Sequence, residues 1–163
     1  MSQLNGEGQA PKRLALVASK GTLDQAYPPL ILATTAASLG WDAGIYFTFY
    51  GLDILDRKKQ EKLKVASLGN PAGPVTIPNL VGALPGATKA ATKMMGKWMG
   101  DAKMPSVPEF IAMAQGLGVK FFACSTTMGV MHVEEEDLIE GCDIAGAAAF
   151  LDYAADADVQ MFV

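Results

Sequence analysis

Short apolar runs, each closed by a polar or glycine-containing turn, recur along the chain between segments of helical length. Three of these runs lie at residues 14–18, 43–50 and 119–124, and a fourth lies at residues 159–163. Apolar runs without alternating polar residues are typical of strands buried on both faces of a parallel sheet. Helical segments between such strands place helices on both faces. The sequence therefore predicts an α/β fold with a parallel sheet of about five strands.

Helix signals occupy the segments between these runs. A helix over residues 30–39 ends at Gly40, and the prolines just before it argue against an earlier regular start. Ser106 is a candidate N-cap, with Pro108 and Glu109 in the first turn of the helix that follows. The further predicted helices are one at 107–117, short ones within 53–64 and at 128–131 and 134–138, and an alanine-rich one at 144–155.

The chain of 163 residues fits one domain of ordinary size. Residues 1–11 are polar and predict a flexible tail, so residues 12–163 form the predicted domain. Residues 69–105 are rich in proline and interrupt the strand–helix pattern as an insertion. Within it, residues 87–99 predict a short basic amphipathic helix. That helix is expected to pack on its own domain or on a neighbouring subunit, with contact to a membrane surface or a partner as the alternative.

Charge and cysteine content exclude several classes. A net charge of −4 disfavours binding to nucleic acid, which depends on basic side chains meeting phosphates. The sequence shows no signal-peptide pattern and no apolar run of about 20 residues that would span a membrane. Two cysteines in a chain of this length predict free thiols in the reducing cytoplasm.

Cys124 is the main candidate for chemistry. It ends a buried strand, and ligands bind at the carboxyl ends of strands in parallel sheets. The backbone amides that follow it, from Ser125 onward, would lower the pKa of its thiol. The alternative is an ordinary core cysteine, since cysteine is among the most buried residue types. Cys142 is either a resolving thiol within disulfide reach or a plain thiol, and His132 is either a base near the same pocket or a surface histidine.

No cofactor and no metal are predicted. The loop Ser19–Lys20–Gly21–Thr22 follows the first strand, but the glycine-rich phosphate-binding and dinucleotide-binding patterns are absent. One histidine and two widely spaced cysteines do not make a zinc pattern.

Several segments, in order and at regular spacing, resemble the DsrE/DsrF-like family, and the Pro-rich insertion is similar to that of its larger, peroxiredoxin-like DsrEFH branch. The resemblance extends from Lys12 to the last residue. The segments that carry it are residues 118–131 with Cys124 at the strand end, 136–141, 146–151 and 159–163, together with Pro78-Asn-Leu, Leu84-Pro-Gly and Thr92-Lys-Met-Met95 in the insertion.

The resemblance implies a flavodoxin-like sheet, a homo- or hetero-oligomer, and a cysteine that accepts a persulfide sulfur and passes it to a partner such as a TusA-like carrier or a rhodanese. Cys124 matches that cysteine, while Cys142 and His132 match no family role. On this reading Ser125 and Thr126 are candidate hydrogen-bond donors, and Lys20 adds positive charge if its loop lies beside Cys124. Two other readings stay open: a thiol redox protein using Cys124 and Cys142, and a non-catalytic oligomeric module that binds a small ligand.

Overall fold

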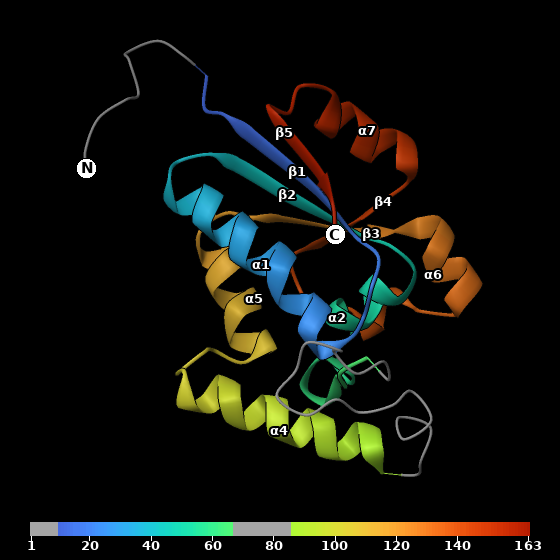
Figure 1. Cartoon of the computed structure of the whole chain (residues 1–163). Coiled ribbons are helices and arrows are strands. Elements are labelled where there is room, and N and C mark those ends of the chain that lie inside the picture. Colours follow the sequence, from blue (N-terminus) through green and yellow to red (C-terminus); the bar gives the residue numbers. More distant parts are fainter. Residues whose placement is uncertain (1–9, 67–85) are drawn as a thin grey trace.

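Five parallel strands form the centre of the computed structural model, which describes residues 10–66 and 86–163 (Figure 1). Their order across the sheet is β4-β3-β2-β1-β5. Each neighbouring pair is parallel. The predicted α/β fold with a parallel sheet is therefore confirmed. The strands are β1 (Arg13–Ala18), β2 (Asp42–Phe47), β3 (Lys120–Cys124), β4 (Cys142–Ala145) and β5 (Val159–Phe162).

Helices cover both faces of this sheet, but unequally (Figure 1). On one face, α1 (Leu23–Ser38), α2 (Leu52–Leu55) and α5 (Val107–Gly116) enclose the larger core. On the other face, α7 (Ala147–Ala155) packs over a smaller core. The short helix α6 (Ser125–Met131) follows β3 directly. Short 3-10 turns lie at η1 (Phe49–Gly51), η2 (Gln60–Lys62) and η3 (Glu135–Asp137).

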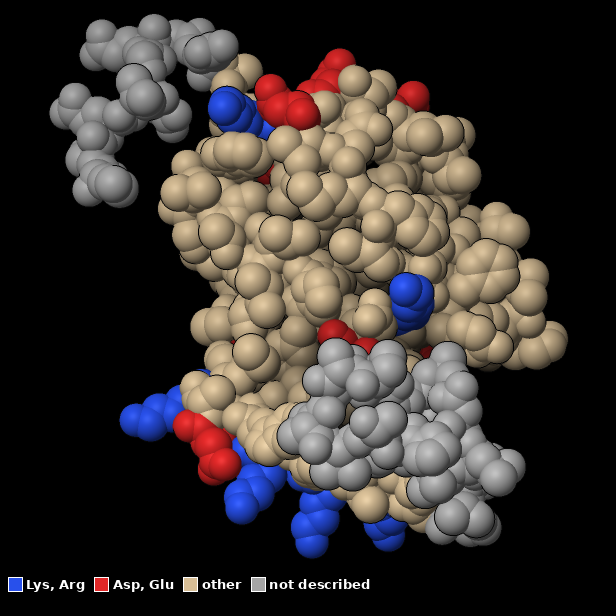
Figure 2. All heavy atoms as spheres, viewed as in Figure 1, with Lys and Arg blue, Asp and Glu red and all other residues tan. Residues whose placement is uncertain are grey.

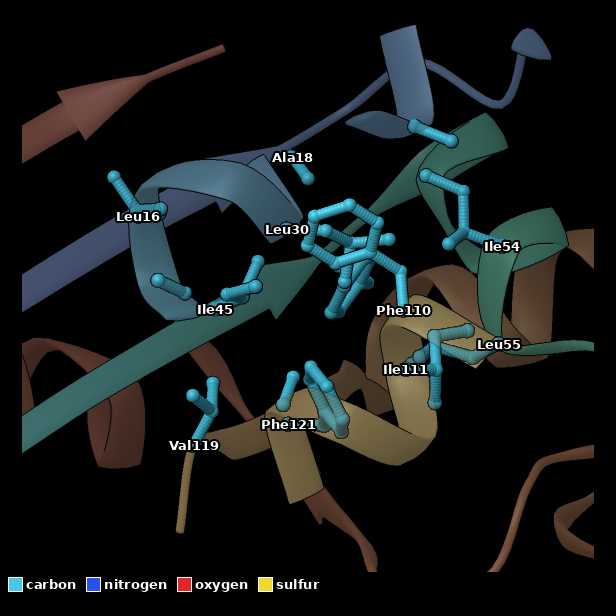
Figure 3. Packing of buried hydrophobic residues seen from close by; sticks show 14 of the residues in the cluster. Leu16, Ala18, Leu30, Ile45, Ile54, Leu55, Phe110, Ile111, Val119 and Phe121 are labelled. Atoms are coloured by element: carbon cyan, nitrogen blue, oxygen red, sulfur yellow. The ribbon is translucent and has the colours of Figure 1, made fainter. Parts of the chain in front are cut away.

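The larger core is built from the alternate side chains of the strands and the apolar sides of the helices (Figure 3). Phe121 of β3 and Phe47 of β2 are fully buried and meet edge to face, with ring centroids 5.8 Å apart. Burying one such side chain contributes roughly 1.5–3 kcal/mol. Because side chains alternate across a strand, Cys124 points to the opposite face from Ala123 and joins the smaller core. Alternation along β3 therefore decides which face carries the thiol.

Two local predictions were wrong in their extent. The alanine-rich helix predicted at 144–155 begins only at Ala147, because Cys142–Ala145 pairs with β3 as an edge strand. The first helix begins at Leu23 and contains Pro28 and Pro29. Pro29 is fully buried, so packing against the sheet compensates for the hydrogen bonds that the prolines remove. Tertiary burial outweighed local propensity in both places.

Other predicted elements are confirmed with small shifts. The helix predicted at 107–117 is α5, and Ser106 is its N-cap residue as expected. The Ser106 amide donates to Glu109 Oε2 at 2.7 Å in a capping box, and the Ser106 hydroxyl donates to the same oxygen. The strand predicted to reach residue 50 ends at Phe47 and turns into η1. The helix predicted at 128–131 already begins at Ser125.

The predicted basic helix is α4 (Ala87–Asp101), which lies outside the sheet and its covering helices (Figure 1). Over these residues, all of which the structure describes, no side chain is buried. Basic side chains project along this edge of the molecule (Figure 2). Residues 1–9 of the predicted tail at 1–11, and residues 69–85 of the predicted insertion at 69–105, lie outside the described residues. Among the helices that are described, none has the length and apolar character to cross a bilayer.

Candidate functional site

Cys124 lies at the junction of two elements, as the last residue of β3 and the N-cap residue of α6. This places it at the carboxyl end of the sheet, where parallel sheets bind ligands. Its side chain is only 6% exposed, and it lies shallowly beneath the surface rather than in the centre of the protein. The cysteine therefore occupies the position that the sequence predicts.

Thr127 donates two hydrogen bonds to the sulfur. Its backbone N–H lies 3.4 Å from Cys124 Sγ, and its Oγ1 lies 3.2 Å from the same atom. The Thr127 hydroxyl is also 2.9 Å from Oγ1 of Thr48, at the end of β2. A hydroxyl has one hydrogen, so when Thr127 donates to sulfur it must accept from Thr48. The two threonines thus form a chain of donors that ends at the thiol.

These donors decide the ionisation of Cys124. Burial raises the pKa of the thiol, but the hydrogen bonds from neighbouring hydroxyls and from the Thr127 amide outweigh burial and lower the pKa to about 7. A thiol with a pKa of 9 is about 1% thiolate at pH 7, whereas a thiol with a pKa of 7 is about half thiolate. About half of the Cys124 thiol is therefore thiolate, the nucleophilic form, at neutral pH.

Tyr46 of β2 is directed at the same sulfur. Its hydroxyl is near enough to help lower the pKa of Cys124, yet it does not meet the distance and angle of a hydrogen bond to Sγ. Within the described ranges the hydroxyl has no other partner. The Tyr46 hydroxyl is thus a buried donor beside the thiol that no acceptor in the described part of the chain meets at hydrogen-bond geometry.

The four predicted supporting residues make no hydrogen bond to the Cys124 sulfur in the structure. Ser125 and Thr126 are exposed, and neither hydrogen-bonds to the sulfur. Lys20 is exposed and lines a shallow pocket with Tyr50 and Asp53, on the far side of β2 from β3. His132 is exposed at the other end of α6, which seven residues place about 10 Å from Cys124. The structure does not bring these four side chains together around the thiol.

Sequence reasoning missed Thr127, Thr48 and Tyr46. A signal for Thr127 was present, because an N-cap side chain accepts from the amide three residues later, and Thr127 is the third residue after Cys124. Nothing local identified the other two residues. Thr48 lies 79 residues from Thr127 in sequence and reaches it only because β2 and β3 are neighbours in the sheet.

Cys142 lies on the opposite face from Cys124. It pairs with Phe121 on β3, three residues before Cys124, and packs against the larger core. Three residues along a strand and one strand spacing separate the two Cα atoms by about 11 Å. A disulfide needs a Cα separation below about 7 Å. Burial raises the pKa of Cys142 to about 12, so its thiol stays protonated at neutral pH.

Sequence comparison now decides the family. The profile of the DsrE/DsrF/DrsH-like family matches residues 10–162. The chain belongs to this family. A relative within the DsrE/DsrF/DrsH-like family, the sulfur carrier protein DsrE2 of Allochromatium vinosum, is 40% identical over 158 residues, which cover 93% of this chain and 98% of that protein. The uncharacterized protein YrkE of Bacillus subtilis is 30% identical over 162 residues, covering 93% and 97%.

Solved structures show the same DsrE-like fold. The YchN protein from E. coli superposes with a TM-score of 0.59 at 12% identity, covering 93% of this chain and 99% of that one. The protein MTH1491 from Methanobacterium thermoautotrophicum, of unknown function, gives a TM-score of 0.53 at 14% identity with the same coverage. The likeness is one of fold, and it agrees with the predicted sheet.

Thr127→Val tests the donor chain of this DsrE-like site. Valine keeps the buried shape but removes the hydroxyl that stabilises the thiolate, so the pKa of Cys124 is expected to rise. At pH 7 the rate of iodoacetamide alkylation of Cys124 should then fall by about tenfold, measured as a rate–pH profile whose midpoint moves up from about 7. Thr126→Val, at an exposed threonine without a bond to sulfur, is the control. An unchanged midpoint in Thr127→Val would refute the donor role.

Proposed function

We propose that this protein is an intracellular sulfur-relay protein that carries a persulfide on Cys124 and passes the sulfur to a partner thiol. One observation carries the proposal: the cysteine at the carboxyl end of β3 accepts two hydrogen bonds from Thr127, and its pKa is lowered to about 7. The chain is also 40% identical to a sulfur carrier protein over nearly the full length of both proteins, which supports the same function.

The chemistry requires no cofactor. The Cys124 thiolate attacks the outer sulfur of a donor persulfide, R–S–SH. A new S–S bond forms to Sγ, the S–S bond of the donor breaks, and the donor leaves as the thiolate R–S⁻. The product is Cys124–S–SH. An acceptor thiolate then attacks its outer sulfur, the S–S bond to Sγ breaks, and Cys124 leaves as a thiolate while the acceptor carries the persulfide. The donors on Thr127 stabilise Sγ as the attacking thiolate and again as the leaving group.

The partner is proposed to be a small sulfur-transfer protein, TusA-like or rhodanese-like, and the chain is proposed to self-associate in the cytoplasm. Exposed apolar side chains close to the carboxyl edge of the sheet support a protein-binding surface there. Phe49, directly after Thr48, is 58% exposed, and Phe162, at the end of β5, is 73% exposed. Large exposed apolar side chains that lie together are typical of protein-binding surfaces.

A redox function through an intramolecular Cys124–Cys142 disulfide is less well supported. The two thiols lie on opposite faces of the sheet, and the pKa of Cys142 is raised to about 12. Such a disulfide would require the edge strand β4 to leave the sheet.

Peptide mapping tests the proposed site. After incubation of the wild-type protein with inorganic polysulfide, blocking of free thiols and digestion, mass spectrometry should find an added mass of about 32 Da, one sulfur atom, on the Cys124 peptide. The Cys142 peptide serves as an internal control and should remain unmodified. Addition to the Cys142 peptide, or no addition to either, would contradict the proposal.

A further inference from the structure

The Tyr46 hydroxyl is a buried donor without an acceptor. The residue is 7% exposed, and in the part of the chain that the structure describes its hydroxyl has no hydrogen-bond partner. Buried polar groups are nearly always paired, because leaving one unpaired is destabilising. An exception beside a reactive thiol calls for a physical explanation.

Packing holds this phenol in place. The ring of Tyr46 stacks on Phe150 of α7, with centroids 4.6 Å apart and an interplanar angle of 16°. Tyr46 pairs with Phe122 in the β2–β3 ladder, so Cys124 is its diagonal neighbour on the same face. Diagonal neighbours are within reach of an aromatic side chain. The hydroxyl is therefore fixed beside the sulfur instead of being free to turn to solvent.

Cys124 Sγ already accepts two hydrogen bonds, both from Thr127. An additional sulfur on Cys124 would lie about 2.05 Å beyond Sγ, the length of an S–S bond. The lone pairs of that outer sulfur can accept hydrogen bonds, but both Thr127 donors already bond to Sγ. The phenol is the remaining donor directed at this side of the site, and burial together with the nearby thiol raises its pKa, so it keeps its proton at neutral pH.

We propose that Tyr46 is a positioning residue for the loaded state, donating its phenolic hydrogen to the outer sulfur of the Cys124 persulfide. This inference rests on the proposed sulfur-relay function. The donor is unpaired while the site is empty and becomes paired when sulfur is bound. Sulfur loading therefore gives the buried Tyr46 hydroxyl an acceptor. This hydrogen bond stabilises the persulfide relative to the empty thiol and favours retention of the sulfur until an acceptor thiol arrives.

The exchange with a small persulfide gives a balanced measure of this effect. The Cys124 thiolate and glutathione persulfide yield Cys124–S–SH and the glutathione thiolate, with one S–S bond formed and one broken. The exchange constant follows from the fraction of protein that carries about 32 Da of added mass at fixed ratios of glutathione persulfide to glutathione.

Tyr46→Phe is the decisive variant, because phenylalanine keeps the stacked ring and removes only the hydroxyl. Its exchange constant should be about tenfold lower than that of the wild type, as for the loss of one hydrogen bond to a charged or polarisable acceptor. The alkylation midpoint of the empty thiol should also rise, because Tyr46 helps to lower the resting pKa of Cys124, but by less than in Thr127→Val. Tyr50→Phe, which removes an exposed hydroxyl at the same end of the sheet, should leave both quantities unchanged.

The outcomes separate the two proposals. If wild-type Cys124 takes up no sulfur, the sulfur-relay function itself is wrong. If Cys124 loads but Tyr46→Phe has the wild-type exchange constant, only the role of Tyr46 is wrong. The role of Tyr46 would also be wrong if the fall in the exchange constant were fully explained by the shift in the alkylation midpoint of the empty thiol. Tyr46 would then act only on the resting thiolate. If Tyr46→Phe does not fold, fluorotyrosine at position 46, a stronger donor of similar shape, must raise the exchange constant for the inference to stand.

Discussion

Cys124→Ser is expected to abolish sulfur loading completely. Serine is close in size to cysteine and can keep the N-cap hydrogen bond from Thr127, so the fold of β3 and α6 should survive. A hydroxyl has a far higher pKa than the thiol and supplies no thiolate to attack a persulfide sulfur. Intact-mass measurement after incubation with inorganic polysulfide should therefore show no addition of about 32 Da.

Cys142→Ser is the matched control for this experiment, since the same change is made one strand away. Cys142 faces the larger core with its pKa raised to about 12, so its removal should leave loading at the wild-type level. Equal loading of Cys124→Ser and wild type would sink the assignment of Cys124. Loading that disappears only in Cys142→Ser would transfer the assignment to the other thiol.

Gly51→Ala is expected to destabilise the protein by more than about 3 kcal/mol or to prevent folding. A Cβ at Gly51 would lie 2.2 Å from the backbone oxygen and 2.9 Å from the carbonyl carbon of Ala18. Both atoms belong to the backbone at the end of β1, so no side-chain rotation can relieve the clash. Thermal unfolding should show a fall in Tm of about 10 °C or more.

Gly96→Ala is the matched control for this variant, and it is expected to cause no loss of stability. Gly96 lies inside α4, and an added Cβ there meets no atom within 4 Å. Alanine favours a helix over glycine by about 0.5–1 kcal/mol, so this variant should be as stable as the wild type or more stable. Two variants with the same loss of Tm would show that the approach of Gly51 to β1 does not matter for stability.

Local pattern was sufficient where an element depends on its own residues. The run that ends at Cys124 is apolar apart from Lys120, and this pattern indicates a buried strand whichever strands flank it. Ser106 and Glu109 carry the capping signal of α5 within four residues. The position of the thiol at the carboxyl edge of the sheet follows from the same local reasoning, because that position depends only on the chain direction of one strand.

Non-local pairing decided the elements that local pattern misjudged. Residues 142–145 have a weak strand signal, and they extend only because the edge of β3 offers hydrogen bonds to them. Because residues 142–145 are held in this strand, the alanine-rich segment forms a helix only after Gly146. A short strand of this kind is stabilised mainly by its neighbour in the sheet.

The sequence by itself therefore determined the fold class, the family and the cysteine that ends β3, because each of these follows from residue types and their order along the chain. Only the tertiary structure decided what surrounds that cysteine. Placing β2 beside β3 brings Thr48 and Tyr46 to the sulfur from nearly 80 residues away, as the Thr48–Thr127 separation of 79 shows. The alternation of side chains along β3 also directs Cys124 and Cys142 to opposite faces. Neither the approach of Thr48 and Tyr46 nor the separation of the two thiols can be read from spacing along the chain, since both arise from the order and register of strands in the sheet.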